Sequence, residues 1–568
     1  MHFFIATTAL QEFWDSDTDI IGLGEWCHPK KSDILSNTIP FIWDKAVKID
    51  DAAIYCWQIY DIVLNDLVGR FNKHHNLQQS KRYWEVIIGN WLYTFIQVIY
   101  DRLLTIEDLI RTYPSFETIL LSEESFSIPL DYNDFISKVS EDLYNLQLYS
   151  QILSYKGFSF VRKDYPSEQN LTYRQQCNKR KNYFYRILRL FSKKAGITVT
   201  SPYFTGGMKS YFQLWKASKR QIVFDDFDDS FSFEFTISSN RGALFKDNLP
   251  GQDPFLTLLY SLLDTHIPIL FLEGFQPFRE FVLQKKTYPS QLYATANAAH
   301  SNFLFKFWIA ENLPSIRFIS IQHGGGYGIE KVSSPEIYER NISDKMLTWG
   351  WRESDNTLPS THEKINHAIN PNRKGGILFV STGLPRYIYR LQTKYNSSLY
   401  KTVYIPKTIA FFKYAGGVDR FIFRPYPYEY GFRMTEKIQT YFPSLRIDDR
   451  QKTLYQQMAR SRILVTDHID TIVLETLAMN FPTIVFIEEV NHSFRDPSIV
   501  QWLVEAKILF FNEEEAAAHL NAVYGNVSEW WNSATVQVAR EHFCKKYART
   551  SSNWANEWVD IFNRLLES

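Results

Sequence analysis

Apolar and polar residues alternate in blocks along the chain, and the blocks predict strands and helices in turn. Short runs rich in Val, Ile, Leu and Phe are typical of buried strands, whereas the segments between them have the 3.6-residue apolar spacing of helices. The predicted strands lie at residues 197–200, 267–272, 291–295, 316–321, 376–384, 421–425, 463–465 and 483–486. Because strands separated by helices form parallel sheets, the pattern predicts the α/β class.

The length of 568 residues exceeds what one ordinary core supports, so more than one domain is expected. A first strand at 19–27 ends in a glycine-bearing loop, and a polar stretch at 332–344 with a Ser-Ser-Pro turn predicts the linker. We therefore expect two Rossmann-like domains facing a central cleft. The predicted parts are a first domain over 1–340 with a helical insertion at about 40–155, a second domain over 341–540, and a C-terminal helix over 541–568 that packs back on the first domain.

The segment 462–486 contains a strand, a polar loop, a helix and a second strand, which is one step of a parallel sheet. Asp470 and Thr471 precede that helix, whose N-terminus favours phosphate, and Glu475 would face the same crevice. Asp or Thr at this position is also an ordinary N-cap, so the segment alone does not decide between the two roles. The pattern resembles the nucleotide-binding half of GT-B glycosyltransferases.

Composition and charge exclude several classes of protein. The chain has 62 basic residues (Lys and Arg) and 62 acidic residues (Asp and Glu), so its formal net charge is zero. No overall attraction to nucleic acid is therefore expected. The four cysteines form no CxxC pair, which argues against a disulfide framework and a zinc site and favours a reducing, cytoplasmic location. The acidic run 225–229 is more typical of a solvated loop than of a cation site, so no metal and no cofactor are expected. No apolar run reaches the ~20 residues of a membrane span, although peripheral contact with the inner membrane stays open.

Residues 319–328 predict a buried strand that breaks into a glycine-rich loop at a histidine. Glycines allow backbone N–H groups to approach a phosphate or a sugar. His323, with an ordinary pKa of about 6.5, is a candidate general base for an acceptor hydroxyl, and the alternative is a histidine that caps a turn. The neighbouring candidates for contact with the acceptor are Gln322, Gly324, Gly325 and Gly326.

Further candidates stand at the predicted ends of other strands. In the second half, Arg424 offers a cation for a leaving phosphate, although an arginine there is otherwise a salt-bridge partner. In the first half, Glu25 and Glu273 are candidate acceptor-site residues or ordinary caps, and Glu273 is also a catalytic candidate. The turn His300, Ser301 and Asn302 has the same two interpretations. The candidates for donor binding are Ser381, Thr382, Gly383, Arg424, Asp467, His468, Asp470, Thr471 and Glu475.

Several motifs together resemble a transferase family named after a spirochaete locus and found in bacterial surface-polysaccharide loci. They are Gly22-Leu23-Gly24-Glu25-Trp26-Cys27, residues 82–92, His300-Ser301-Asn302, Gln322-His323-Gly324-Gly325-Gly326-Tyr327-Gly328 and Leu347-Thr348-Trp349-Gly350-Trp351, with the unit 467–482 extending the match. The resemblance implies a surface-glycan transferase without naming its sugar.

A broader similarity reaches the polyol-phosphate and capsule-sugar transferases of GT-B type. There a histidine-glycine pair acts near the acceptor, and a Thr-Asp-x-x-Ser/Thr turn binds the donor phosphate. His323-Gly324 and Thr466-Asp467 through Thr471 match this pattern, but His468-Ile469-Asp470 replaces the usual aromatic-serine pair.

The expected function is an inverting, metal-independent transfer of a sugar from a nucleotide-sugar donor to a surface-polysaccharide or lipid-linked glycan acceptor. In this hypothesis His323 deprotonates the acceptor, while Arg424 and the helix after Asp470 and Thr471 stabilise the departing phosphate. Three alternatives remain open: a polyol-phosphate transferase, a nucleotide-sugar epimerase, and a non-catalytic glycan-assembly protein.

Overall fold

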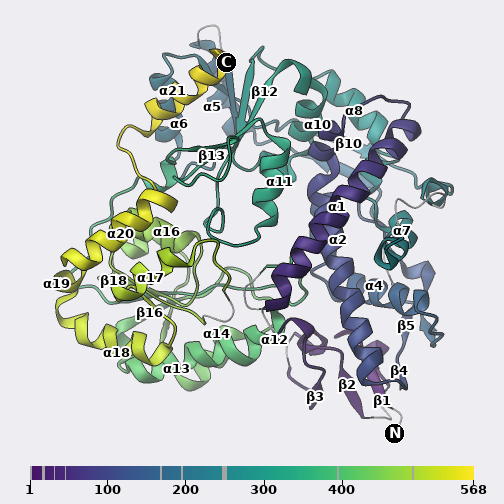
Figure 1. The fold of residues 1–568 in the computed structure, drawn as a ribbon, viewed down its shortest axis with the longest axis horizontal. Coiled ribbons are helices and arrows are strands. Elements are labelled where there is room, and N and C mark those ends of the chain that lie inside the picture. Colours follow the sequence, from purple (N-terminus) through teal and green to yellow (C-terminus); the bar gives the residue numbers. More distant parts are fainter. Residues whose placement is uncertain are drawn as a thin grey trace.

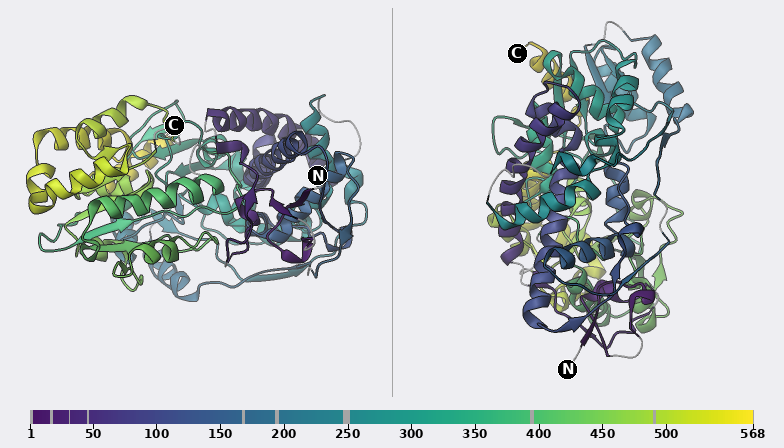
Figure 2. Two further views of the ribbon diagram at one scale, coloured as in Figure 1. Left: turned by 90° about the horizontal axis from the view of Figure 1, so that it is seen from below. Right: turned by 90° about the vertical axis from the view of Figure 1, so that its right-hand side faces the viewer.

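The computed structural model describes residues 3–15, 19–30, 32–44, 47–166, 169–192, 196–245, 252–392, 396–488 and 492–567. Its framework is two six-stranded sheets, one in each half of the chain, with a helical region along one flank of the molecule (Figures 1 and 2). In the described part of the chain, no helix has both the length and the apolar character required to cross a bilayer.

The first sheet has the strand order β14-β13-β12-β11-β8-β9, and every neighbouring pair is parallel. Its central strands are buried on both faces, as expected for a parallel sheet covered by helices. The strands are β8 Ile197–Thr200, β9 Ile222–Phe224, β11 Leu292–Thr295, β12 Arg317–Ile321, β13 Lys345–Thr348 and β14 Thr357–Pro359. The associated helices are α5 Lys179–Leu190, α6 Met208–Ala217, α9 Ala298–Ser301, α10 Phe303–Asn312 and α11 Ser334–Ile342.

The second sheet has the order β17-β16-β15-β18-β19-β20, again with parallel pairs throughout. Numbered within this domain, the order is 3-2-1-4-5-6, which is that of the Rossmann fold. The strands are β15 Ile377–Val380, β16 Phe421–Arg424, β17 Arg446–Ile447, β18 Ile463–Thr466, β19 Thr483–Phe486 and β20 Leu509–Phe510. The helices are α12 Ser397–Leu399, α13 Ile405–Ala415, α14 Met434–Tyr441, α15 Leu454–Met458, α16 Thr471–Ala478, α17 Pro497–Glu505, α18 Glu513–Val523 and α19 Val527–Trp531. The predicted α/β class with two Rossmann-like domains is confirmed.

The N-terminal region is built around α2, Lys81–Thr112, which is buried on nearly all of its faces. Such a helix must be enclosed by other elements, and α2 contacts α1 Val47–His74, α4 Asp142–Tyr155, α10 and α11. A small parallel sheet of β1 Phe3–Ala6, β2 Ile20–Gly22, β3 Asn37–Thr38 and β4 Phe116–Glu117 lies at the N-terminal end (Figure 1). The region therefore supports the first domain through the contacts of α2 with α10 and α11.

The last two helices return toward the first sheet. Helix α20 spans Ala534–Tyr547 and packs on α16 and α17, whereas α21 spans Trp554–Glu567 and packs on α6. Trp554, Trp558 and Phe562 share a core cluster with β8 residues, so the chain's end stabilises the first domain.

Two expectations about local structure were wrong. Residues 267–272 do not form a strand: a 3₁₀ turn at Ile269–Phe271 follows helix α7, Pro254–His266, and helices bury it. A short apolar run fits a buried turn as well as a strand. The stretch 332–344 is not a linker, because it contains helix α11, which has Pro335 in its first turn, and β13 and β14 still belong to the first sheet. The chain passes to the second sheet between β14 and β15.

Candidate active site

Two adjoining cavities lie where the carboxyl ends of the two sheets face each other, which is the usual ligand position in such folds. The first-domain cavity is about 320 Å³ and the second-domain cavity about 180 Å³, and they share Arg390, Gln392 and Asp470. The first is lined by Tyr93, Tyr132, His300, His323, Gly324, Gly325, Gly326, Tyr327, Glu330, Ser333, Pro335 and the shared residues. The second is lined by Thr382, Gly383, Leu384, Pro385, Tyr389, Tyr426, Tyr430, His468, Ile469, His492 and the shared residues.

The side chain of Gln322, which is fully buried, fixes the glycine-rich loop after β12 by hydrogen bonds. Its Oε1 accepts hydrogen bonds from the Trp349 backbone at 2.7 Å and from Trp351 Nε1 at 2.8 Å, and its Nε2 donates to the Gly324 carbonyl at 2.9 Å. Gln322 therefore positions the loop and does not itself line the cavity.

Gly325 joins the two domains at close range. Its N–H donates to Thr471 Oγ1 at 3.0 Å, and a Cβ on Gly325 would lie 2.4 Å from the Thr471 backbone nitrogen. Only a residue without a side chain allows this approach. A Cβ on Gly324, by contrast, would have no described atom within 4 Å, so that position faces open space.

We expect Gly325→Ala to destabilise the protein by about 2 kcal/mol, because the added methyl meets backbone that cannot move aside. Thermal unfolding measures the effect. Gly324→Ala is the matched control and should leave the melting temperature nearly unchanged. Equal melting temperatures for the two variants would show that the Gly325 contact does not hold the domains together.

His323 belongs to a cluster with two groups from other elements, His300 of α9 and Glu339 of α11. His323 Nδ1 lies 3.5 Å from Glu339 Oε1, and that oxygen also accepts hydrogen bonds from His300 Nε2 and, at 3.0 Å, from the Tyr327 hydroxyl. Glu339 is 1% exposed. His323 Nδ1 and Glu339 Oε2 are buried, and neither has a hydrogen-bond partner in the described part of the chain. The His323 ring therefore turns Nδ1 toward the Glu339 carboxylate, has the Ala296 backbone as a further neighbour and lines the first-domain cavity.

Burial shifts the titration of all three groups. It raises the pKa of the Glu339 carboxyl to about 7, against the lowering effect of nearby His323. It lowers the pKa of His323 to about 4 and that of His300 to about 3. Both imidazoles are therefore neutral at pH 7, and His323 can accept a proton whose charge the adjacent carboxylate would stabilise.

The same three residues offer one ligand atom each within 4.8 Å of one another, so they could also hold a metal ion. The carboxylate oxygen already accepts two hydrogen bonds, which favours proton handling over ligation. The expected metal independence stays a prediction that a chelator tests.

The predicted donor residues divide into two groups. Thr382, Gly383, His468 and Asp470 line the second-domain cavity. Ser381 and Asp467 are buried beneath it. The Asp467 carboxylate accepts hydrogen bonds from Tyr404 and Thr408, and Ser381 Oγ lies 3.3 Å from the Met434 sulfur. These contacts give Ser381 and Asp467 a supporting role in the loops rather than direct contact with a ligand.

The helix terminus after Asp470 is already partly occupied. The Asp470 side chain accepts a hydrogen bond from the Thr471 N–H at 2.7 Å, and Thr471 Oγ1 is used by Gly325. A phosphate placed directly at this terminus would meet the negative charge of Asp470, so the N-cap role of Asp470 is the one that the contacts support.

The sequence predicts Arg424 as a free cation at the end of its strand, but the structure does not show it free. It is buried and paired with Asp448, and it also donates to the Lys452 carbonyl at 3.3 Å. Its charge is compensated within the second domain. The salt-bridge alternative is therefore the one that the structure supports.

Glu475 lies in a separate cavity of about 540 Å³ lined by Thr205, Lys364, Thr453, Leu454, Tyr455, Thr471, Ile472 and Glu475. Its carboxylate is buried and pairs with Lys364 Nζ at 2.9 Å. Asp470 lines the cleft and Thr471 lines this second space, so the contact between Gly325 and Thr471 separates the two. A donor that reaches Glu475 would have to extend past that contact.

Several first-half candidates lie outside the cavity linings. Glu25 pairs with Lys401 Nζ at 2.6 Å, and Glu273 pairs with buried Arg241 at 2.8 Å. Asn302 caps α10, and the Ser301 carbonyl accepts a hydrogen bond from Asn133. Of the turn at 300–302, only His300 lines the first-domain cavity.

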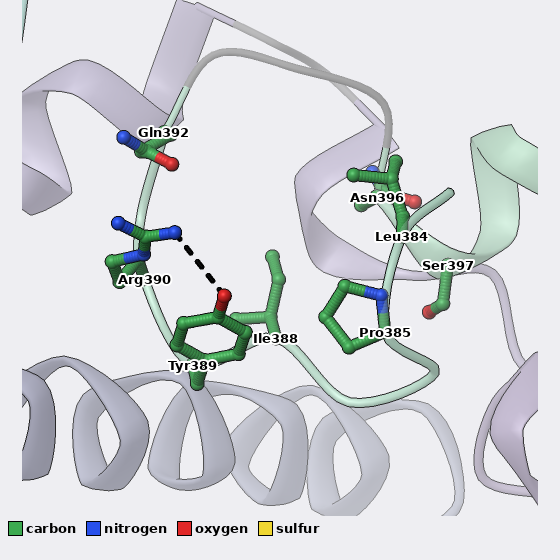
Figure 3. Close-up of a pocket in the computed structure, with 8 residues that line it drawn as sticks. All are labelled: Leu384, Pro385, Ile388, Tyr389, Arg390, Gln392, Asn396 and Ser397. Atoms are coloured by element: carbon green, nitrogen blue, oxygen red, sulfur yellow. Dashed lines mark hydrogen bonds between the residues drawn. The ribbon is translucent and has the colours of Figure 1, made fainter. Parts of the chain in front are cut away.

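Arg390, a cation that lines this cleft, is not among the residues predicted from the sequence. Arg390 follows β15 on the loop 384–392, and its guanidinium donates to the Tyr389 hydroxyl at 3.1 Å (Figure 3). Among the described residues it has no carboxylate partner, and it lines both halves of the cleft. An unpaired arginine flanked by Tyr93 and Tyr132 is suited to bind an anionic group. The available signal was the Pro-Arg-Tyr-Ile-Tyr-Arg run directly after a strand.

Comparison with known proteins gives one match over almost the whole chain: the family model described as LIC12162 family transferase covers residues 3–562. No curated protein sequence matches. Among solved structures, Anabaena HepE in complex with UDP and glucose aligns at 11% identity and a TM-score of 0.36, over 66% of this chain and all of that one. The wall teichoic acid polymerase TagF aligns at 9% and 0.31, over 68% of this chain and 94% of its own. MurG from Acinetobacter baumannii aligns at 8% and 0.32, over 65% and 99%. At such low values, the substrates of these enzymes do not carry over to this chain.

Proposed function

This chain belongs to the LIC12162 family of transferases, and we propose that it transfers a sugar from a nucleotide-sugar donor to a hydroxyl of a surface-polysaccharide or lipid-linked glycan. One observation carries the proposal. A neutral imidazole backed by a buried carboxylate lies on one side of an interdomain cleft, and Arg390, which has no carboxylate partner among the described residues, lines both of its halves. A base for an acceptor hydroxyl and a cation for a phosphate are the two groups that an inverting glycosyl transfer requires.

The proposed reaction has one proton transfer and one displacement. His323 Nε2 takes the proton of the acceptor hydroxyl while the acceptor oxygen forms a bond to the anomeric carbon of the donor. The bond from that carbon to the donor phosphate breaks on the opposite face, and the nucleotide leaves with the electron pair. Attack from the face opposite the leaving group inverts the anomeric configuration. The Glu339 carboxylate stabilises the imidazolium that forms.

Arg390 is assigned to the donor phosphate in place of Arg424. Its guanidinium carries five N–H donors in a planar fork, which suits phosphate oxygens, and charge-assisted hydrogen bonds of this kind are the strong ones. Thr382 and Gly383 line the same cavity, but the Thr382 N–H already donates to the Tyr404 hydroxyl and its carbonyl accepts from Tyr400, so we assign the phosphate side of this loop to Gly383. The first-domain cavity is left for the acceptor.

We expect kcat/KM to rise with pH, with a midpoint near 7. Glu339 has its raised pKa of about 7, so it is a neutral acid below that pH and a carboxylate above it. Only the carboxylate supports protonation of His323, whose own pKa of about 4 keeps it neutral across the same range. Initial rates measured against pH test this. Glu339→Gln should lower the rate and flatten the profile around pH 7; a profile that keeps its midpoint in this variant would assign the titration to another group.

Two assays separate the remaining alternatives. Release of nucleotide that requires both donor and glycan acceptor supports glycosyl transfer, whereas conversion of the donor sugar without an acceptor indicates an epimerase. Transfer of a phosphate together with an alcohol indicates a polyol-phosphate transferase, which the same base and cation would serve. Acceptor binding without nucleotide affinity would indicate a glycan-assembly protein. Rates that are unchanged by EDTA would support a metal-independent mechanism.

We place the reaction on the cytoplasmic side, where nucleotide sugars are the expected donors. The four cysteines are free, which suits a reducing compartment.

A further inference from the structure

Helix α5, Lys179–Leu190, has an apolar stripe directed away from the protein. Tyr183 is 67% exposed and Leu190 is 81% exposed, Ile187 lies between them on the same face, and Phe191 at the helix end is 61% exposed. The spacing of three and four residues places these side chains on one side of the helix. The opposite side packs into the first domain through Tyr185 and Leu188, so the helix is anchored and its outer stripe is uncovered.

The charged residues of α5 are all basic. Its sequence contains five basic residues and no acidic one. Lys181 pairs with Asp226 and Arg189 lies over the Tyr288 ring, so part of this charge is directed toward the protein. Arg186 and Arg189 line a cavity that also contains Asp225, Asp228 and Asp229. The exposed basic residues beyond it are Lys216, Lys219 and Arg220 at the end of α6 and just after it, and none of them forms an ion pair with a carboxylate in the described part of the chain.

Helix α6 extends the same surface. Trp215 of α6 donates a hydrogen bond to Ser192 just beyond α5 at 3.0 Å, so the two helices meet there. On α6, Met208 is 67% and Phe212 is 49% exposed, and Phe212 contacts the Trp215 ring. Figure 1 shows α5 and α6 beside α21, at the end of the molecule opposite the N-terminus.

We propose that α5, with the adjoining end of α6, docks the protein on the surface of an anionic lipid bilayer. An amphipathic helix with large apolar residues on one face and basic residues at its flanks is suited to lie in the lipid headgroup region. The exposed basic residues Lys216, Lys219 and Arg220 beside this surface favour an anionic bilayer, because each basic residue near such a surface is attracted to it. In the described part of the chain, no other element covers these exposed apolar residues, and such patches mark interaction surfaces. This inference concerns where the enzyme works and does not depend on which reaction it catalyses.

The test is co-sedimentation of the full-length protein with two kinds of vesicle, phosphatidylcholine alone and phosphatidylcholine with phosphatidylglycerol. The wild type should bind the second kind, and rising salt should weaken that binding because screening reduces the attraction. The double variant Leu190→Asp/Phe191→Asp should lose at least about tenfold in binding. Both side chains are exposed, so the melting temperature should not change.

Val161→Asp/Val538→Asp is the matched control, because it places the same added charge at two other exposed apolar positions. It should bind vesicles as the wild type does. The proposal is overturned if the wild type binds neither kind of vesicle, or if the Leu190 and Phe191 variant binds as well as the control. It is also overturned if light scattering shows a dimer of the wild type that this variant abolishes, since the surface would then be covered by a second copy of the chain.

Discussion

His323→Ala is expected to lower the transfer rate by about 100- to 10,000-fold, which is the usual contribution of a positioned general base. The imidazole is neutral at pH 7, has one nitrogen turned toward Glu339 and lines the first-domain cavity. The acceptor hydroxyl then has no group to take its proton. Initial-rate measurements at saturating donor and acceptor give the loss in kcat.

Donor binding should survive this substitution, because the donor residues belong to the second-domain side of the cleft. The nucleotide dissociation constant of His323→Ala should therefore stay within about twofold of the wild type, a change of about 0.4 kcal/mol. His542→Ala, at an exposed position on α20, is the control and should have normal rates. Full turnover by His323→Ala would remove this residue as the base.

The second large effect is a contrast between two arginines. Arg390→Gln should weaken nucleotide binding by roughly 30-fold, or about 2 kcal/mol, because a charge-assisted hydrogen bond to phosphate is lost. Its melting temperature should change little, since no described carboxylate depends on it. Binding isotherms and thermal unfolding of the same preparations measure both quantities.

Arg424→Gln should have the opposite result. Removing one partner of the buried pair leaves Asp448 uncompensated and should cost about 3 kcal/mol of stability. Nucleotide affinity of the folded fraction should be close to that of the wild type. If Arg424→Gln lost affinity while Arg390→Gln kept it, the assignment of the phosphate cation would have to be reversed.

The sheets could be predicted from the sequence because their strands are short apolar runs bounded by polar turns. The unit around residues 463–486 was predicted with its strand, helix and second strand in the right order. The 267–272 run was not predicted correctly, because burial among helices requires the same apolar residues as burial in a sheet. Of the small N-terminal sheet, β2 was predicted, within the strand expected at 19–27, whereas the other strands have only two to four residues and are too short to give a periodic pattern.

The site was predicted only where one local segment contains it. His323 and its glycines follow a strand directly, and the structure places them in the cleft. Glu339 was missed because it lies on α11, which the polar sequence presented as a linker. Arg390 was missed because the sequence does not show which arginines have a carboxylate partner. The partners of Arg424 and Arg390 are set by tertiary contacts.

The most direct test of the central claim is thermal-shift binding of the purified protein to CMP, CDP, UDP, GDP and dTDP, with and without Mg²⁺. Stabilisation by one nucleotide, reduced in Arg390→Gln and kept in His323→Ala, is the predicted result, and the nucleotide would identify the class of donor. No stabilisation by any of the five would contradict a nucleotide-sugar transferase and favour a glycan-assembly protein.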